Sequence, residues 1–385
     1  MAGTKEYIAE FGSKSFEELP FSDSDALTLC EMFYMPLEQT VSSSFDDEPV
    51  EFSKAANELY ALRNYKHKKL GLMITKNASV NMVAMAATQR YCDMKIYAVN
   101  EVYSFQPAIQ YCAGTFILPD GTLVVIFRGT DDTIAGWKED LDLFVKKNPP
   151  AYELALNYIE KLASHKDGNF IICGHSKGGN IALHTALKCS DEVRHRIKGI
   201  YNCDGPGYHD FGIFHLGTYD EILPVYKHYV PSSSMIGMLL AHDYDYKAVK
   251  SSRLTGAFQH DIGTWQIDDG EIVTLPDVNK MAKLTDAAIS RVCSFATDEV
   301  TTAIDNITTL VIGGIGQETL TETAKHIASS IKGISEAIKE ISPVDKDIIK
   351  EAFKGSGKFL VETVKDIKNS NVAEMTRLAY SHITR

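Results

Sequence analysis

The feature that most constrains this sequence is a glycine-rich segment between an apolar run and a helical pattern. Asn169 to Cys173 form the apolar run, Gly-His-Ser-Lys-Gly-Gly follows at 174–179, and residues 180–189 have helical spacing. A strained strand-to-helix turn of this kind lifts a serine hydroxyl above the edge of a sheet. Glycines flank the serine because side chains there would collide with neighbouring backbone. We therefore predict a nucleophile elbow with Ser176 as the nucleophile.

Strand and helix patterns alternate around this segment. Residues 113–127 predict a β-hairpin about an Asp-Gly turn, and residues 151–165 predict a helix with an apolar stripe. Further strands are expected at 197–203 and 225–230, whereas residues 15–100 are expected to be mainly helical. This alternation predicts an α/β fold of the α/β-hydrolase type, with a mostly parallel sheet covered by helices on both faces.

The C-terminal third has a different pattern, which predicts a C-terminal all-helical extension. Apolar residues recur in steps of four and three from Leu320 to Ile341, and this spacing is typical of a coiled-coil seam. We expect an α/β-hydrolase domain with a helical N-terminal region over 1–278, and a helical bundle or coiled coil over 279–385. The seam is compatible with self-association, with a protein partner and with packing on the hydrolase domain.

Composition excludes several classes of function. A net charge of −12 argues against nucleic-acid binding, which depends on Lys and Arg at the phosphates. The seven cysteines are scattered without close pairs, so neither a disulfide framework nor a zinc site is predicted. A serine mechanism implies no metal and no organic cofactor. Neither a secretory signal nor a transmembrane stretch is apparent. The prediction is a cytoplasmic protein, with export by a route that needs no such signal left open.

An acyl-transfer enzyme also needs donors for the oxyanion. Lys177 directly follows the nucleophile, where the turn leads into the expected helix, so its backbone N–H is the natural first donor. The second donor should come from the loop after an earlier strand. Residues 127–132 close the Val-Val-Ile-Phe run and fit that place, and we assign the Thr130 backbone N–H. His175 beside the nucleophile is expected to point away and to pack.

Two groups of residues resemble those of class 3 lipases. They are Phe-Arg-Gly-Thr through Gly-Trp-Lys-Glu-Asp-Leu over 127–141, and Gly-His-Ser at 174–176. Asp-Gly-Pro-Gly at 204–207 and Gln-His-Asp at 259–261 before Trp265 are similar, more narrowly, to bacterial lipase-like proteins catalogued as a domain of unknown function. The resemblance covers roughly residues 20–270. It implies a compact α/β hydrolase that cleaves esters.

The general base is expected after the serine, in the chain order Ser, acid, His. The candidates are His209, His215, His228, His242 and His260. We choose His260, which follows the last expected strand and matches the Gln-His-Asp segment of the resemblance.

The acid is harder to assign. Class 3 lipases usually carry it in the loop after the next strand, but here residues 231–234 read Pro-Ser-Ser-Ser and contain no carboxylate. Asp204, at the end of the strand 197–203, is our choice, with Asp243 and Asp261 as alternatives. A turn residue that bonds its own backbone is the competing interpretation of Asp204.

The functional hypothesis is a serine hydrolase that cleaves carboxylic esters, with a lipid or other acyl ester as substrate and Ser176, His260 and Asp204 as the triad. Residues 131–148 are compatible with an amphipathic lid and equally with a fixed surface helix. The alternative function is a catalytically weak or inactive hydrolase fold that acts as a binding or effector module through its C-terminal helices. Contact with a membrane surface is a further partner prediction.

Overall fold

The computed structural model describes residues 3–62, 77–105, 107–131, 133–145, 149–208, 211–240, 246–254 and 256–280, and short pieces within 282–347. In these residues a nine-stranded sheet has the order β1-β2-β3-β4-β5-β6-β7-β8-β11. Pairs from β4 to β8 are parallel, and the flanking pairs are antiparallel. The strands are β1 Val50–Glu51, β2 Lys95–Phe105, β3 Ala108–Ile117, β4 Leu123–Phe127, β5 Phe170–His175, β6 Ile197–Cys203, β7 Tyr226–Pro231, β8 Lys247–Val249 and β11 Thr274–Leu275.

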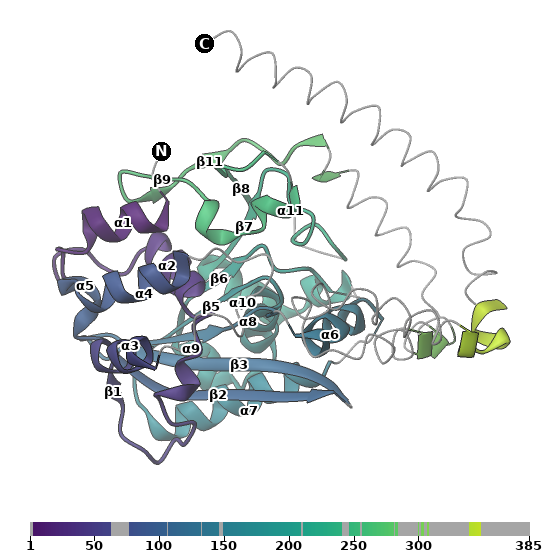
Figure 1. The fold of residues 1–385 in the computed structure, drawn as a ribbon, viewed down its shortest axis with the longest axis horizontal. Helices are drawn as coiled ribbons and strands as arrows, with labels where there is room; N and C mark the ends of the chain where they lie inside the picture. Colours follow the sequence, from purple (N-terminus) through teal and green to yellow (C-terminus); the bar gives the residue numbers. More distant parts are fainter. Residues whose placement is uncertain are drawn as a thin grey trace, which may run out of the picture.

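Helices cover both faces of the sheet (Figure 1). One layer contains α1 Thr4–Phe11, α2 Asp23–Met32, α3 Phe52–Ala61, α4 Asn77–Ala86 and α5 Gln89–Cys92. The opposite layer contains α7 Pro150–His165, α8 Lys177–Lys188, α9 Asp191–Arg196 and α10 Gly217–Ile222. The expected α/β class, with parallel strands at the centre and helices on each side, is confirmed.

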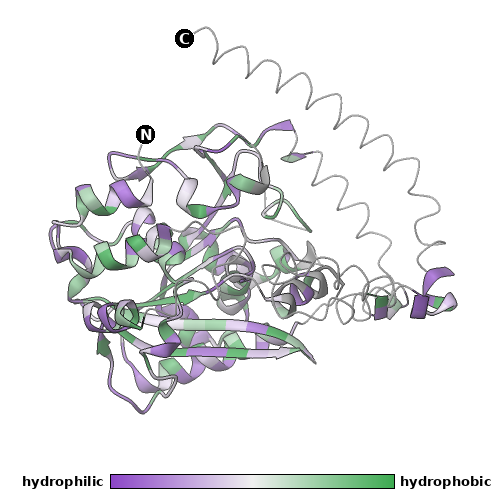
Figure 2. Cartoon of the chain, in the orientation of Figure 1, coloured by the Kyte–Doolittle hydropathy of each residue, from purple (hydrophilic) through white to green (hydrophobic). Residues whose placement is uncertain are grey.

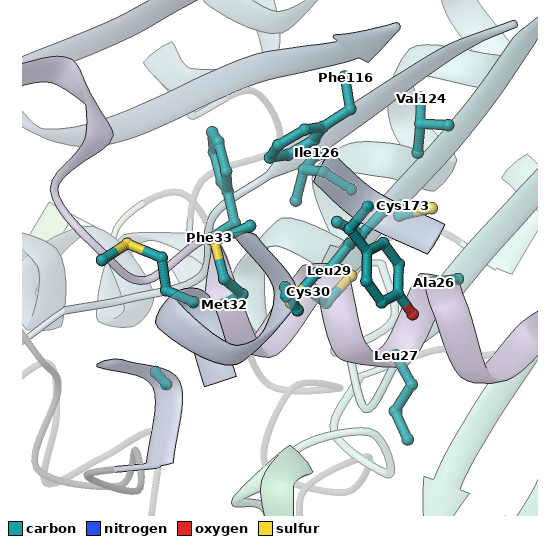
Figure 3. Close-up of a cluster of buried hydrophobic side chains, with 14 of the residues drawn as sticks. Ala26, Leu27, Leu29, Cys30, Met32, Phe33, Phe116, Val124, Ile126 and Cys173 are labelled. Carbon is teal, nitrogen blue, oxygen red and sulfur yellow. The ribbon is translucent and has the colours of Figure 1, made fainter. Parts of the chain in front are cut away.

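Strand β4 shows why both faces are covered. Val124 and Ile126 pack against α2, in the cluster that Figure 3 shows. The alternating residues Leu123, Val125 and Phe127 pack against the layer of α7 and α8. Successive side chains of a strand point to opposite faces, so a strand that is apolar throughout needs a cover on each side. Figure 2 shows hydrophobic and hydrophilic residues together on the N-terminal helices, which have one face to bury.

The sheet is larger than the sequence predicted. The hairpin of β3 and β4, the helix α7 and the strands β5, β6 and β7 lie where we expected them. Residues 95–100, assigned to a mainly helical region, instead begin β2, which pairs with β3 from Lys95 to Phe105. Strands β8 and β11 also extend the sheet beyond residue 230. Such short strands carry too few residues for a periodic signal, and pairing with a neighbour decides their conformation.

In the residues that the structure describes, the remaining elements are two helices, several 3-10 turns and a short hairpin. They are α6 Ile134–Val145, α11 Gly256–Gln259, the 3-10 turns Leu37–Gln39, Phe211–His215, Leu223–Val225 and Ile262–Thr264, and a small hairpin of β9 Ile267–Asp268 and β10 Glu271–Ile272. Most of the expected seam Leu320–Ile341 and most of the region 279–385 lie outside the described residues. No helix in the described part of the chain is long and apolar enough to cross a membrane.

A buried ion pair joins the helices of the N-terminal layer. Arg90 of α5 donates to Asp25 of α2 at 2.5 and 2.7 Å, and both side chains are fully buried. Arg90 also donates to the carbonyls of Leu19 and Pro20, and Tyr91 donates to Asp25. Because every group has a partner, the charges are tolerated in the interior. The network sets the position of α2 beneath the sheet.

Arg90→Met should therefore lower the free energy of unfolding by about 3–5 kcal/mol, since it leaves the Asp25 carboxylate buried without its partner. Urea unfolding followed by circular dichroism measures this change. Arg253→Met removes an exposed arginine and should stay within about 0.5 kcal/mol of the wild type. Equal midpoints for the two variants would contradict the network.

Candidate active site

Ser176 lies at the junction of β5 and α8, at the C-terminal edge of the parallel strands. Its backbone is in the left-handed region, with φ 57° and ψ −132°, and it is the N-cap residue of α8. The Ser176 N–H donates to the carbonyl of Cys203 at 2.9 Å. A non-glycine residue in this conformation is strained, and surrounding structure must hold it there. The local geometry is that of the elbow expected from the sequence.

Two glycines allow the elbow to form. A Cβ atom on Gly174 would overlap the carbonyl of Gly178, and a Cβ atom on Gly178 would overlap the carbonyl of Phe127. The first turn of α8 thus packs directly on the backbone of β5 and β4. No side chain fits between these backbones, and so the serine has little freedom to move.

His260 bridges Ser176 and Asp204. Its Nε2 is 3.0 Å from Ser176 Oγ and its Nδ1 is 2.6 Å from Asp204 Oδ2. Asp204 accepts the hydrogen carried by His260 Nδ1. In the neutral ring Nε2 then carries no hydrogen, and it can accept from the Ser176 hydroxyl. All three side chains are largely buried. A hydroxyl, an imidazole and a carboxylate in this order form the arrangement that activates a serine.

Asp204 follows β6 directly, with φ 53°, and its side chain is fully buried. Its second oxygen, Oδ1, accepts from Ser234 Oγ at 2.5 Å and from the backbone N–H of Gly237 at 3.0 Å. The loop after β7, in which we found no carboxylate, thus supplies donors to an acid that stands after β6. Sequence reasoning missed this role of Ser234, because a serine in a Ser-rich loop carries no distinguishing signal.

The other candidates are placed differently. The Asp261 side chain accepts from the backbone N–H of Gly263 and caps a 3-10 turn. His215 and His228 lie in other elements, and in the described part of the chain His260 is the histidine bonded to Ser176. His209, His242 and Asp243 lie outside the described residues.

The loop assigned to the second oxyanion donor lies against the elbow. A Cβ atom added to Gly129 would be 3.0 Å from Ser176 Cβ. Thr130 follows, and its hydroxyl donates to Asp140 Oδ1 at 2.6 Å. Burial raises the pKa of the Asp140 carboxyl to about 6, although Lys177 and the bond from Thr130 act in the opposite direction.

Helix α6 is tied to the start of α8 by a buried ion pair. Lys177 Nζ donates to Glu139 Oε2 at 2.5 Å and to both oxygens of Gln110. Glu139 also accepts from the Gln110 backbone N–H at 3.0 Å. These buried contacts favour a fixed helix over the amphipathic lid that the sequence also allowed. The side chains of Ile134, Trp137, Leu141 and Phe144 lie outside the described residues.

His175 does more than pack. Its Nδ1 is 2.8 Å from the Tyr34 hydroxyl, and its Nε2 is 2.8 Å from the carbonyl oxygen of His260. Burial, and then the nearby His260, lower its pKa well below the usual value. Two residues earlier in β5, Cys173 is fully buried, and burial raises the pKa of its thiol, which disfavours the thiolate that a nucleophile needs.

Comparison with known proteins gives one match. A family model described as Mbeg1-like matches residues 85–308, more than half of the 385 residues, and this range includes Ser176, Asp204 and His260. No curated protein and no solved structure matches. The resemblance to class 3 lipases therefore stays a prediction.

The two carboxylates near His260 can be distinguished by amide substitutions. Asp204→Asn should slow the reaction of Ser176 with a fluorophosphonate by about 10⁴-fold, because the amide cannot hold the His260 tautomer that accepts the serine proton. Asp261→Asn keeps a capping oxygen and should react at about the wild-type rate. Fluorophosphonate labelling that is quenched at successive times and read by gel fluorescence measures both rates. The reverse order would assign the acid to Asp261.

Proposed function

This chain belongs to the Mbeg1-like family, and we propose that it is a serine hydrolase of the α/β-hydrolase type that cleaves carboxylic esters. The observation that carries the proposal is the bonded order of Ser176, His260 and Asp204, with separations of 3.0 and 2.6 Å. Buried groups in this order lower the cost of removing a proton from a serine hydroxyl. The strained elbow at Ser176 is a second support.

The proposed reaction has two halves. In the first, His260 takes the Ser176 proton while Ser176 Oγ attacks the ester carbonyl, and His260 then returns the proton to the leaving alcohol. In the second, His260 takes a proton from water, the resulting hydroxide attacks the acyl-serine, and the acid product leaves as Ser176 regains its proton. Asp204 orients the His260 ring and stabilises its charged form in both halves.

The oxyanion would be held by the backbone N–H groups of Lys177 and Thr130. Lys177 is the first residue of α8, and the first N–H groups of a helix have no partner within it. The positive end of the helix dipole adds to this stabilisation. The hydrogen bond from the Thr130 hydroxyl to Asp140 holds this segment in place. A single oxyanion donor typically contributes about 2.7–4 kcal/mol to transition-state stabilisation.

The substrate we propose carries an apolar acyl chain, as a lipid or acyl ester does. Leu254 and Phe258 lie in the segment that leads to His260, and their side chains are 65% and 64% exposed. Two large apolar side chains exposed within six residues of the base in the sequence favour a substrate that covers them. Chain length and leaving group are to be found by screening esters.

Fluorophosphonate labelling tests the proposal directly. The wild type should label at Ser176, and Ser176→Ala and His260→Ala should each abolish labelling, because the first lacks the nucleophile and the second its base. Ser164→Ala and His195→Ala, at exposed positions of the same residue types, are matched controls and should label like the wild type. Mass spectrometry identifies the modified peptide. An unlabelled wild type would favour the non-catalytic binding module.

Truncation separates the enzyme from a module that acts through its C-terminal helices. The cut belongs after Lys283, since Asn279 donates to the Ser232 carbonyl and Ala282 packs with Val230. We expect the truncated chain to label within about threefold of the full chain, because the triad and its supports precede the cut. A folded truncated chain that has lost labelling would contradict an independent hydrolase domain.

A further inference from the structure

The histidine between Gly174 and Ser176 joins the nucleophile to the base. His175 ends β5, is 2% exposed, and its Nε2 lies 2.8 Å from the backbone carbonyl oxygen of His260. The two imidazole rings are 4.6 Å apart, at an interplanar angle of 33°. The His175 side chain thus connects the position next to the nucleophile with the backbone of His260, the proposed base.

The hydrogen-bond partners determine the tautomer of His175. A carbonyl oxygen can only accept, so Nε2 of His175 must carry the hydrogen that it donates to His260. In the neutral ring Nδ1 is then an acceptor, and it receives the Tyr34 hydroxyl hydrogen at 2.8 Å. Burial also lowers the pKa of His175, so the ring stays neutral. Both ring nitrogens are satisfied in only this arrangement.

Neighbouring contacts hold the rest of the His260 segment. Trp265 Nε1 donates to the carbonyl of Gln259 at 2.9 Å, and Gln259 Oε1 accepts from the Ser233 N–H at 2.8 Å. These bonds act on Gln259, whereas the carbonyl of His260 itself is held by His175. The position of the His260 backbone relative to Ser176 thus depends on the His175 donor.

We propose that His175 is a positioning residue that aligns His260 with Ser176 by donating to the His260 carbonyl, and that the Tyr34 hydroxyl supports this tautomer by donating to Nδ1. The inference rests on the proposed hydrolase function. It assigns a role to the Tyr34 hydroxyl, two residues after α2, and so links the N-terminal helical layer to the site.

The arrangement matters because the chemistry depends on small displacements. A shift of about 1 Å between a base and its nucleophile can cost roughly a hundredfold in rate. His260 also becomes positively charged when it takes the serine proton. A neutral His175 at 4.6 Å adds no repulsion to that charge, whereas a protonated one would oppose it.

Two amide substitutions separate the bonds of His175. The amide nitrogen of Gln reaches the place of histidine Nε2, so His175→Gln keeps the donor to His260. The amide of Asn reaches only the place of Nδ1, so His175→Asn keeps a partner for Tyr34 and loses the donor to His260. Both replace a buried imidazole by a buried amide, and each is thus the matched control for the other.

We expect fluorophosphonate labelling of His175→Asn to be about ten- to a hundredfold slower than that of the wild type. His175→Gln should restore the rate to within about threefold of the wild type, a recovery that a general loss of packing would not produce. Thermal unfolding checks that the two variants are equally folded. Equal labelling rates for His175→Asn and wild type, or for the two variants when both are folded, would overturn the proposal.

Nuclear magnetic resonance of protein labelled with ¹⁵N-histidine gives a second readout that needs no activity. In the wild type at pH 7, His175 should be neutral with the hydrogen on Nε2. Tyr34→Phe should keep this tautomer, because the carbonyl of His260 still accepts from Nε2. A protonated His175, or one with the hydrogen on Nδ1 in the wild type, would overturn the inference even if the variants do not fold. A wild type with the expected tautomer that fails to label would contradict the proposed function and leave the His175 bond established.

Discussion

The close approach of α8 to the backbones of β4 and β5 is the constraint on which the site depends. Gly174 and Gly178 have no room for a Cβ atom, and this contact holds Ser176 in a left-handed conformation at the start of the helix. The strain is local, but packing on both faces of the sheet sustains it. Because backbone contacts fix Ser176, the other groups of the site must be positioned to match it.

Three buried polar networks extend from this point into different layers. His260, Asp204 and Ser234 reach across β6 and β7, and Lys177 with Glu139 ties in α6. His175 reaches the N-terminal layer through Tyr34. In a low-dielectric interior each hydrogen bond is stronger and each unpaired group is costly, so such networks favour a single arrangement. The helical layers thus hold the geometry of the site as well as covering the sheet.

The sequence predicted those parts whose pattern is local. Apolar runs and turn residues located β3 to β7, and the Gly-rich turn located Ser176, since a strand, a turn and a helix follow one another within twenty residues. The first part of β2, residues 95–100, was assigned to a mainly helical region because its mixture of apolar and polar residues fits either period. Pairing with β3 decides the conformation. Asp204 could be proposed but not separated from Asp261 by sequence, since a carboxylate after a strand is equally suited to capping a turn.

The elbow follows from the sequence alone, because the steric demand for glycine on either side of a strained serine acts between near neighbours in the chain. The sequence also proposed His260 and Asp204, but the contacts that complete the site form only when the chain folds. Tyr34, Ser234 and His260 are far apart in sequence, and folding brings their polar atoms to within hydrogen-bond distance of the elbow or of Asp204. No sequence pattern marks a tyrosine or serine for such a contact. The contact forms because a buried polar group must find a hydrogen-bond partner.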